Sequence, residues 1–362
     1  MIKTINVHLK ERGYKILVGR GLLSKTGDLL KGLKIGNDAV IISNRTIFAH
    51  HGKKLLLGLK RAGLSAKTLL VPDSEKSKSA GVVFSVLKKM AAYDVRKNIF
   101  LIAFGGGVVG DAGGFLASIY KRGIPLVQVP TTFLAQIDSA IGGKAAIDLA
   151  AGKNLVGSFY QPRMVISDID VLSTVGLRQI RNGMAEAIKY GVICDRALFR
   201  FIERNYRGAL AGRQDVLAFL VHRCSRIKAA IVSADEKETK ALRTILNFGH
   251  TAGHAIEAAG AYQRYQHGEA IALGMRVAAD IARQLKLFSQ QDCQRLEKIL
   301  SLIDLPQRIQ GLSMGRILKV MAHDKKFKGS VNRFVLPVSI GRVKVIENVP
   351  RKVIEKALRK YL

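Results

Sequence analysis

The feature that most constrains the fold is a change of pattern about halfway along the 362-residue chain. The first half alternates amphipathic segments, such as residues 79–93, with continuous apolar runs typical of buried parallel strands. These runs are residues 39–42, 67–71, 99–104 and 125–129. From about residue 172 apolar residues recur at helical spacing, over residues 180–193, 216–231, 250–259, 270–285 and 293–303. Strand-like runs return only at residues 333–336 and 342–346.

This pattern predicts an α/β N-terminal domain with a parallel sheet over residues 1–171, followed by a mainly α-helical C-terminal domain over residues 172–362. Apolar residues make up 48% of the chain, enough for two cores. We find no signal-peptide pattern at the start and no apolar run of the length that a spanning helix needs. The three cysteines are scattered and form no metal knuckle, which fits a reducing compartment. We therefore expect a cytoplasmic protein.

The formal net charge of +32 raises the question of a polyanionic partner. The Lys and Arg residues are spread along the whole chain, without a basic block or a zinc finger, and aromatic residues make up only 6%. We therefore expect a solvated basic surface, with some cations reserved for an anionic substrate, and neither nucleic acid nor membrane as a partner.

A glycine-rich segment predicts a nucleotide-binding loop. Gly105, Gly107 and Gly110 satisfy the spacing G-x-G-x-x-G directly after a predicted strand and before a predicted helix. Glycine lets the backbone approach a pyrophosphate, whose charge the helix N-terminus favours. The alternative is a tight strand-to-helix turn, because no acidic residue follows about 20 positions later. Asp111 and Asn44 are candidates for a ribose hydroxyl.

A divided set of metal-binding residues lies in the second half. His250 and His254 stand four apart, so a helix places both on one face. His267 follows, and Glu186 lies upstream. Two imidazoles, one carboxylate and an open position make a catalytic zinc site. The alternatives are a salt-bridged glutamate and a structural histidine. A metal and a dinucleotide together suggest redox chemistry on a polar substrate.

Polar and cationic side chains suited to an anionic substrate accompany these motifs. In chain order they are Thr131, Thr132, Lys144, Lys153, Lys189, Arg243 and Asn247. The two threonines follow a strand at a predicted helix start, and the first two lysines adjoin glycines in predicted loops. A single such lysine is usually a solvated loop charge, so the inference depends on several of them accompanying a metal motif.

Taken in order, these motifs resemble the 3-dehydroquinate synthase family over nearly the whole chain. The matching segments are GGGVVGD at 105–111, YKRG at 120–123, QVPTT at 128–132, IGGK at 141–144, GKNLVG at 152–157, FYQP at 159–162, MAEAIKYG at 184–191, LNFGH at 246–250 and HGEA at 267–270.

The resemblance implies a phosphate-eliminating carbon–oxygen lyase of the shikimate pathway, and thus of chorismate and aromatic amino acid biosynthesis, dependent on NAD and on Zn²⁺ or Co²⁺. It would convert 3-deoxy-D-arabino-heptulosonate 7-phosphate to 3-dehydroquinate and phosphate by transient oxidation, elimination, re-reduction and intramolecular aldol closure. The family also implies a homodimer acting on a small sugar-acid phosphate.

The resemblance further implies residue roles at matching positions. The metal ligands would be Glu186, His250 and His267. Catalytic or substrate-contacting positions would be Arg122, Asp138, Lys144, Asn154, Lys189, Lys228, Arg243, Asn247, His254 and Lys325, the last adjacent to Lys326. Cofactor-contacting positions would be Asn44, Glu75, Lys78, Gly105, Gly106, Gly107, Val108, Asp111, Thr131, Thr132, Asp138, Lys144, Lys153 and Thr174.

Departures from the family pattern are modest: Ala145 replaces a frequent Thr, and Asp148 a common Asn. Three alternatives stay open: a related cyclase acting on sedoheptulose 7-phosphate or glucose 6-phosphate, a metal-dependent polyol dehydrogenase, and a basic nucleic-acid binder. Those cyclase substrates lack a carboxylate, so the joint presence of Lys228, Arg243 and Asn247 favours 3-dehydroquinate synthase chemistry.

Overall fold

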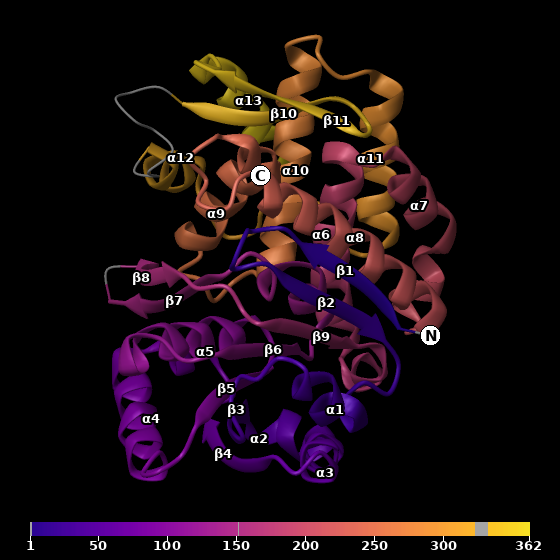
Figure 1. Ribbon diagram of the computed structural model, residues 1–362. Coiled ribbons are helices and arrows are strands. Elements are labelled where there is room, and N and C mark those ends of the chain that lie inside the picture. The colour runs from indigo at the N-terminus through magenta and orange to yellow at the C-terminus, as the bar shows by residue number, and fades with distance from the viewer. Residues whose placement is uncertain (1, 151, 323–331) are drawn as a thin grey trace. The chain divides into compact units, whose positions relative to one another are not determined.

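A computed structural model of the chain describes residues 2–150, 152–322 and 332–362 (Figure 1). The chain divides into two compact units. Unit 1 comprises Met1–Gly176 together with Leu217–Lys237, and unit 2 comprises Leu177–Val216 together with Glu238–Leu362. The predicted domain boundary at residues 171 and 172 thus falls shortly before Gly176, and a helical segment from further along the chain is added to unit 1.

A seven-stranded sheet forms the centre of unit 1. Its spatial order is β1-β2-β9-β6-β5-β3-β4, and every neighbouring pair is parallel except β1–β2. The strands are β1 (Lys3–Val7), β2 (Tyr14–Gly19), β3 (Asp38–Asn44), β4 (Ser65–Val71), β5 (Ile99–Gly105), β6 (Leu126–Pro130) and β9 (Met164–Asp168). The predicted parallel sheet is confirmed, and the four predicted strands correspond to β3, β4, β5 and β6.

Helices and a hairpin complete unit 1. The α-helices are α1 (Thr26–Lys31), α2 (Arg45–Ile47), α3 (Lys53–Arg61), α4 (Ala80–Tyr93), α5 (Gly107–Ile119) and the part of α8 (Gln214–Ala234) from Leu217 onward. The 3₁₀ segments are η1 (Leu23–Lys25), η3 (Glu75–Lys78), η4 (Tyr120–Arg122) and η6 (Ile169–Thr174), and the π-helical segments are η2 (Phe48–Gly52) and η5 (Ala135–Ser139). Strands β7 (Lys144–Leu149) and β8 (Gly152–Phe159) pair antiparallel.

The central strands are mainly apolar because both faces of the sheet are covered. All seven residues of β5 are buried. Successive side chains alternate between faces, and Leu101 and Ala103 of β5 share one core cluster with Val83 and Val86 of α4 and Leu116 of α5. Helices α4 and α5 therefore cover the same face of the sheet.

Hydrogen bonds explain why residues 217–237 belong to unit 1. Ser225 donates its hydroxyl to the Gln136 carbonyl at 3.0 Å, and the His8 amide donates to the Ser233 hydroxyl at 2.9 Å. Arg12 and Glu236 form an ion pair at 2.8 Å. These contacts hold one helix against segments that are distant in the sequence.

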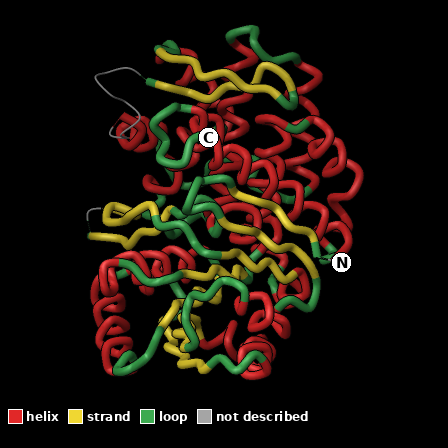
Figure 2. The backbone as a smooth tube through the Cα atoms, in the orientation of Figure 1, coloured by secondary structure: helices red, strands yellow, loops and turns green. Residues whose placement is uncertain are grey.

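Unit 2 is nearly all helix, as Figure 2 shows for the later part of the chain. Its α-helices are α6 (Leu177–Cys194), α7 (Arg196–Leu210), α9 (His250–Ala259), α10 (His267–Gln284), α11 (Gln290–Leu302), α12 (Met314–Ala322) and α13 (Arg351–Tyr361), with a 3₁₀ segment η7 (Leu242–Asn247). Strands β10 (Arg333–Ser339) and β11 (Arg342–Glu347) form an antiparallel hairpin. The predicted helical texture and both late strands are confirmed.

Helix α10 is the core of unit 2. Apart from Glu269, its residues from Gly268 to Ala282 are all buried, and it packs against α6, α9, α11 and α13. A helix covered on every side is expected to be mainly apolar, and the two charges that α10 buries are paired, Arg276 with Glu297 and Asp280 with Lys360. Within the described ranges, none of the helices combines the length and the apolar character that a membrane-spanning segment requires.

A stability prediction concerns Asp168, which is 2% exposed at the end of β9. Its carboxylate accepts from the backbone amides of Gly21, Leu23 and Asp170 at 3.0, 2.9 and 3.0 Å. Asp168→Ala leaves these amides without their acceptor, so we expect the free energy of unfolding to fall by about 3 kcal/mol. Urea denaturation followed by circular dichroism measures this loss. The exposed Asp215→Ala variant is the control, and an equal midpoint shift in both variants would contradict the assignment.

Candidate active site

The sheet of unit 1 has a topological switch point between β3 and β5. From β3 the chain adds β4 on one side and then β5 on the other, so the strand order reverses there. Ligands of open α/β sheets bind beyond the carboxyl ends of the strands at such a point. Asn44 ends β3, accepts from the Ile47 amide at 2.9 Å and donates to Asp73 at 2.6 Å. Gly105 ends β5.

The glycine loop has the predicted strand–loop–helix context. Gly106 precedes α5, which begins at Gly107 and continues through Val108 and Asp111. A Cβ atom at Gly107 would lie 3.0 Å from Ser139 Oγ, so a larger residue would press on that hydroxyl. The Oγ atoms of Thr131 and Ser139 are buried without a hydrogen-bond partner among the described residues. A helix N-terminus beside such hydroxyls suits a phosphate group.

A buried lysine network adjoins this loop. Lys78, at the end of η3, is 3% exposed, and its ammonium lies 2.8 Å from Asp111 and 3.8 Å from both Glu75 and Asp148. It also donates to the Asn154 side chain. Burial opposes the ammonium charge of Lys78. The neighbouring carboxylates, Asp111 foremost, outweigh this effect and raise the pKa of Lys78.

The β7–β8 hairpin brings further predicted residues to this network. Lys153 lies 3.4 Å from Glu75, and Asn154, with φ of 56°, donates its amide to Asp148 at 2.8 Å. Lys144 begins β7. Sequence reasoning missed Asp148, for which the sequence carries one signal, the replacement of an Asn that is common in the family.

Short π-helical and 3₁₀ segments carry the other predicted site residues Asp138, Thr174 and Arg122. Segment η5 carries Asp138, whose backbone carbonyl and Oδ1 accept from Lys228 at 2.7 and 2.6 Å. Segment η2 carries the buried His51, whose Nε2 lies 2.8 Å from the Thr174 hydroxyl. Burial lowers the pKa of His51, with the neighbouring cations acting in the same direction. Sequence reasoning missed His51, and π-helical segments often mark functional positions. Arg122 ends η4 on an exposed turn.

Unit 2 brings the three predicted metal ligands together. Glu186 of α6 is 0% exposed, and its Oε1 lies 3.6 Å from His250 Nε2 and 3.5 Å from His267 Nε2. The ligand atoms of all three lie within 4.8 Å of one another. Tetrahedral ligands about 2.1 Å from an ion are about 3.4 Å apart, so these separations suit Zn²⁺.

Glycines fix these ligands at helix crossings. Gly249, with φ of 79°, precedes His250, and a Cβ atom at Gly274 would lie 1.9 Å from the Gly249 carbonyl oxygen. A Cβ atom at Gly268, next to His267, would lie 2.2 Å from the backbone oxygen of Asn182 on α6. No side chain larger than hydrogen fits at either crossing, so α6, α9 and α10 approach closely enough to converge their ligands.

The electrostatics of this cluster favour a bound cation. Burial opposes the imidazolium form of His267, but Glu186 and Glu257 outweigh it and raise its pKa to about 10. Two carboxylates that hold a proton on a histidine also attract a divalent ion, which displaces that proton.

The remaining predicted residues of unit 2 that the structure describes lie on α6, α9 and η7. Lys189 is 2% exposed and forms an ion pair with Glu186 one helical turn earlier. His254 lies on α9 with ring centroids 5.0 Å from His250 and 6.1 Å from His267. Arg243, 3% exposed, and Asn247 both lie in η7, and Arg243 pairs with Glu238 at 3.3 Å. Lys325 and Lys326 lie outside the described residues.

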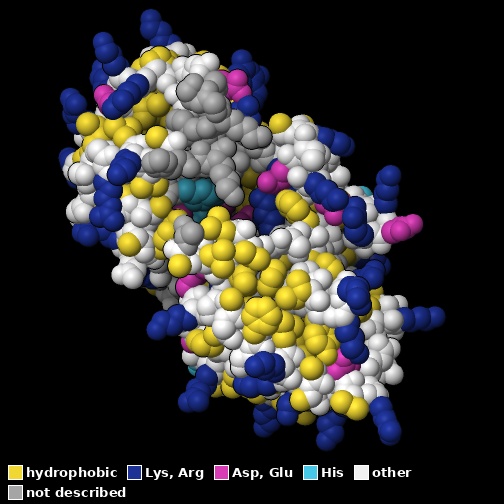
Figure 3. Space-filling view, turned by 90° about the vertical axis from the view of Figure 1, so that its left-hand side faces the viewer, with side chains coloured by type: hydrophobic (Ala, Val, Ile, Leu, Met, Phe, Trp, Pro, Cys, Tyr) yellow, Lys and Arg dark blue, Asp and Glu magenta, His cyan; other side chains and the backbone are white. Residues whose placement is uncertain are grey.

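Other surface features lie apart from these residues. On the face drawn in Figure 3, Lys and Arg side chains are scattered rather than gathered in one patch.

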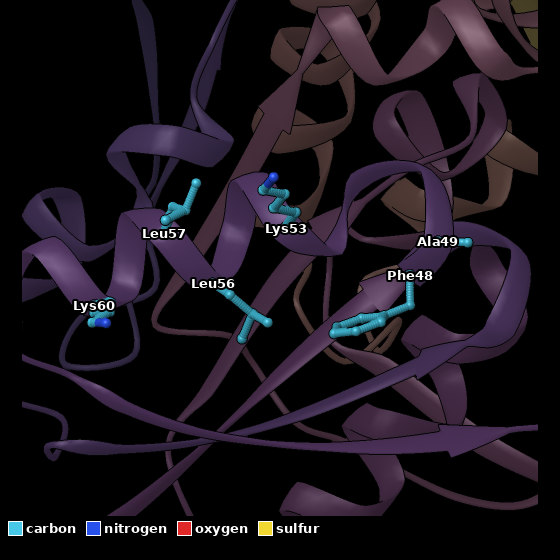
Figure 4. Close-up of a pocket in the computed structure, with 6 residues that line it drawn as sticks. All are labelled: Phe48, Ala49, Lys53, Leu56, Leu57 and Lys60. Atoms are coloured by element: carbon cyan, nitrogen blue, oxygen red, sulfur yellow. The ribbon is translucent and has the colours of Figure 1, made fainter.

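A pocket on η2 and α3 contains none of the predicted site residues. Figure 4 shows its lining, which consists of Phe48, Ala49, Lys53, Leu56, Leu57 and Lys60.

Comparison with solved structures defines the class of fold. A structure of 2-deoxy-scyllo-inosose synthase complexed with carbaglucose-6-phosphate, NAD⁺ and Co²⁺ superposes with a TM-score of 0.88 at 27% identity, covering 100% of both chains. The 2-epi-5-epi-valiolone synthase of Streptomyces hygroscopicus subsp. jinggangensis 5008, with NAD⁺ and Zn²⁺ bound, gives a TM-score of 0.89 at 25% identity, covering 98% of each chain. The fold is that of the sugar-phosphate cyclases.

Sequence comparison is more specific. The protein-family model for the 3-dehydroquinate synthase N-terminal domain matches residues 68–182, and the family model for the C-terminal domain matches residues 183–327. The 3-dehydroquinate synthase of Pelotomaculum thermopropionicum is 42% identical over 348 residues, covering 96% of this chain and 93% of its own. The chain belongs to the 3-dehydroquinate synthase family.

The lysine network generates one prediction. Lys78→Met leaves the Asp111 and Asp148 carboxylates without their buried cation, so we expect the free energy of unfolding to fall by about 3 kcal/mol. Adding Asp111→Asn removes one of these charges, and the double variant should regain part of the loss. Denaturant unfolding of the single and double variants measures the coupling, and strictly additive losses would refute it.

The ligand set generates another prediction. Glu186→Gln and His267→Ala each remove one of three ligand atoms, so both variants should lose stoichiometric Zn²⁺ after equilibrium dialysis while their circular dichroism stays that of a folded protein. The matched control is His222→Ala, which removes a histidine from unit 1 and should keep the metal. Full metal content in the His267→Ala variant would exclude this residue as a ligand.

Proposed function

We propose that this protein is a 3-dehydroquinate synthase that converts 3-deoxy-D-arabino-heptulosonate 7-phosphate to 3-dehydroquinate and phosphate. The observation that carries the proposal is the convergence of His250 and His267 on the buried Glu186, in a chain 42% identical over nearly its whole length to a curated enzyme of that name. The joint presence of Lys228, Arg243 and Asn247 favours a carboxylate-bearing substrate over the substrates of related cyclases.

The residues present fit the two groups that this reaction requires. Glu186, His250 and His267 would hold Zn²⁺ or Co²⁺, since two imidazoles and a carboxylate converge at ligand spacing. The loop from Gly105 to Val108 would hold the NAD pyrophosphate, because its glycines carry no side chain that would keep the backbone from a ligand, and α5 begins there. When bound, NAD accepts and returns a hydride, and the metal polarises substrate oxygens.

The side chains of unit 1 would bind and orient the cofactor. Asn44 lies at the carboxyl end of β3 and Asp111 in the first turns of α5, where ribose hydroxyls are held in such folds. Lys78 orients Asp111, and Thr131 and Thr132 offer hydroxyls beside the loop. The other proposed cofactor contacts are Glu75, Gly106, Gly107, Asp138, Lys144, Lys153 and Thr174.

Cations and amides would hold the charged substrate. We assign phosphate and carboxylate contacts to Arg122, Lys144, Asn154, Lys189, Lys228, Arg243, Asn247 and Lys325. Charge-assisted hydrogen bonds to such groups are stronger than neutral ones. We assign His254 to hydrogen bonding or proton transfer rather than to metal ligation, and Asp138 to the reacting centre, where Lys228 fixes its side chain. We further propose that the enzyme acts as a homodimer in the cytoplasm.

The test is phosphate release by the metal-loaded protein from 3-deoxy-D-arabino-heptulosonate 7-phosphate, with and without catalytic NAD⁺ and with a chelator. We expect release that requires NAD⁺ and metal and leaves no net NADH. Net NADH would instead indicate a polyol dehydrogenase.

The same assay with other substrates separates the alternatives. Release from sedoheptulose 7-phosphate or glucose 6-phosphate, but not from the sugar acid, would assign the protein to a related cyclase. Absence of release from all three substrates by metal-loaded protein would overturn the proposed function.

A further inference from the structure

Glu257 contacts a proposed metal ligand on the side away from the ligand cluster. Its Oε2 lies 3.4 Å from His267 Nδ1, while His267 Nε2 lies 3.5 Å from Glu186 Oε1. The two ring nitrogens of one histidine thus face two different carboxylates. The Glu257 side chain is only 12% exposed, so its charge lies largely out of water.

Helix α9 explains how Glu257 reaches this place. His250, His254 and Glu257 follow one another at intervals of four and three residues, so they lie along one face of the helix. His267 is the first residue of α10, after a turn in which Ala261 and Tyr262 adopt left-handed backbone conformations. The α9 face therefore presents a carboxylate to a ring at the end of a loop.

The two proposed histidine ligands differ in what orients them. His250 Nδ1 lies 3.1 Å from the Phe248 carbonyl oxygen, so the backbone of its own segment sets its tautomer. For His267, the oxygen near Nδ1 belongs to a side chain of another helix. An Nδ1–H group that donates to a carboxylate leaves the Nε2 lone pair for a metal and makes the imidazole a better donor.

We propose that Glu257 is a positioning residue, which fixes the tautomer and ring orientation of His267 so that Nε2 completes the metal site with Glu186 and His250. This inference builds on the metal site of the proposed function. It assigns Glu257 no contact with the ion.

One other arrangement of the same residues makes a different prediction. His254, Glu257 and His267 also bring ligand atoms within 4.8 Å of one another, so an ion held there would use Glu257 as a direct ligand. The 0% exposure of Glu186 favours the first set, because a carboxylate that deeply buried gains most from a cation.

The test measures metal affinity in the absence of substrate and NAD, so that its failure is separate from failure of the lyase assay. Apoprotein is titrated with Co²⁺ against a chromophoric chelator, and the visible absorption of bound Co²⁺ reports the ligand set. The variants are Glu257→Ala, Glu257→Gln and Glu186→Gln, with Glu355→Gln of α13 as a matched control. Thermal melting of each apoprotein checks the fold.

We expect Glu257→Ala to weaken Co²⁺ binding by about 10- to 100-fold, with the wild-type absorption spectrum recovered at saturating metal. Glu257→Gln keeps an acceptor oxygen and should lose less affinity. Glu186→Gln should change the spectrum, and Glu355→Gln should change nothing. Unchanged affinity in folded Glu257→Ala would overturn the proposal. So would an altered spectrum in the Glu257 variants with a normal one in Glu186→Gln, because the ion would then lie on the other set.

Discussion

A carboxylate with no exposure to water, Glu186, is the constraint on which the arrangement of unit 2 depends. Burying such a charge is costly unless cations compensate it. Here Lys189 comes from the same helix, whereas His250 and His267 come from α9 and α10. The imidazoles can reach it only because the crossings at Gly249 and Gly268 lack side chains. The close helix crossings and the convergence of the ligands are therefore both linked to the need to compensate the buried Glu186 charge.

Unit 1 places its polar residues by a different principle. A parallel sheet that is buried on both faces leaves only the strand ends for chemistry, and the reversal of strand order between β3 and β5 opens space there. The glycine loop, the hydroxyls of Thr131 and Ser139 and the Lys78 network belong to segments near this edge. The Lys78 ammonium forms ion pairs with Asp111 and Asp148 and donates to Asn154. The hairpin that carries Asp148 and Asn154 is therefore stabilised by these contacts as well as by backbone pairing.

The sequence was informative where one physical signal dominated. Continuous apolar runs predicted β3 to β6, and helical spacing predicted α6 and α9, including the shared face of His250 and His254. It missed β1, where only Ile5 and Val7 are buried, and β8, whose residues from Asn154 to Phe159 are all exposed. It also missed Asp148, Ser139 and His51. Their positions depend on hydrogen bonds and on π-helical geometry, and neither produces a periodic pattern in the sequence. The resemblance to a family supplied the ligand set that local patterns had left open.

The return of residues 217–237 to unit 1 affects how the chain can be assembled. The polypeptide passes from one unit to the other after residues 176, 216 and 237, so no single cut separates them. When the first 176 residues have been synthesised, all strands of the seven-stranded sheet are present, but the helix that carries Lys228 is not. Expression of the N-terminal half alone would therefore yield a truncated body, with Gln136 and Asp138 deprived of the contacts that Ser225 and Lys228 supply.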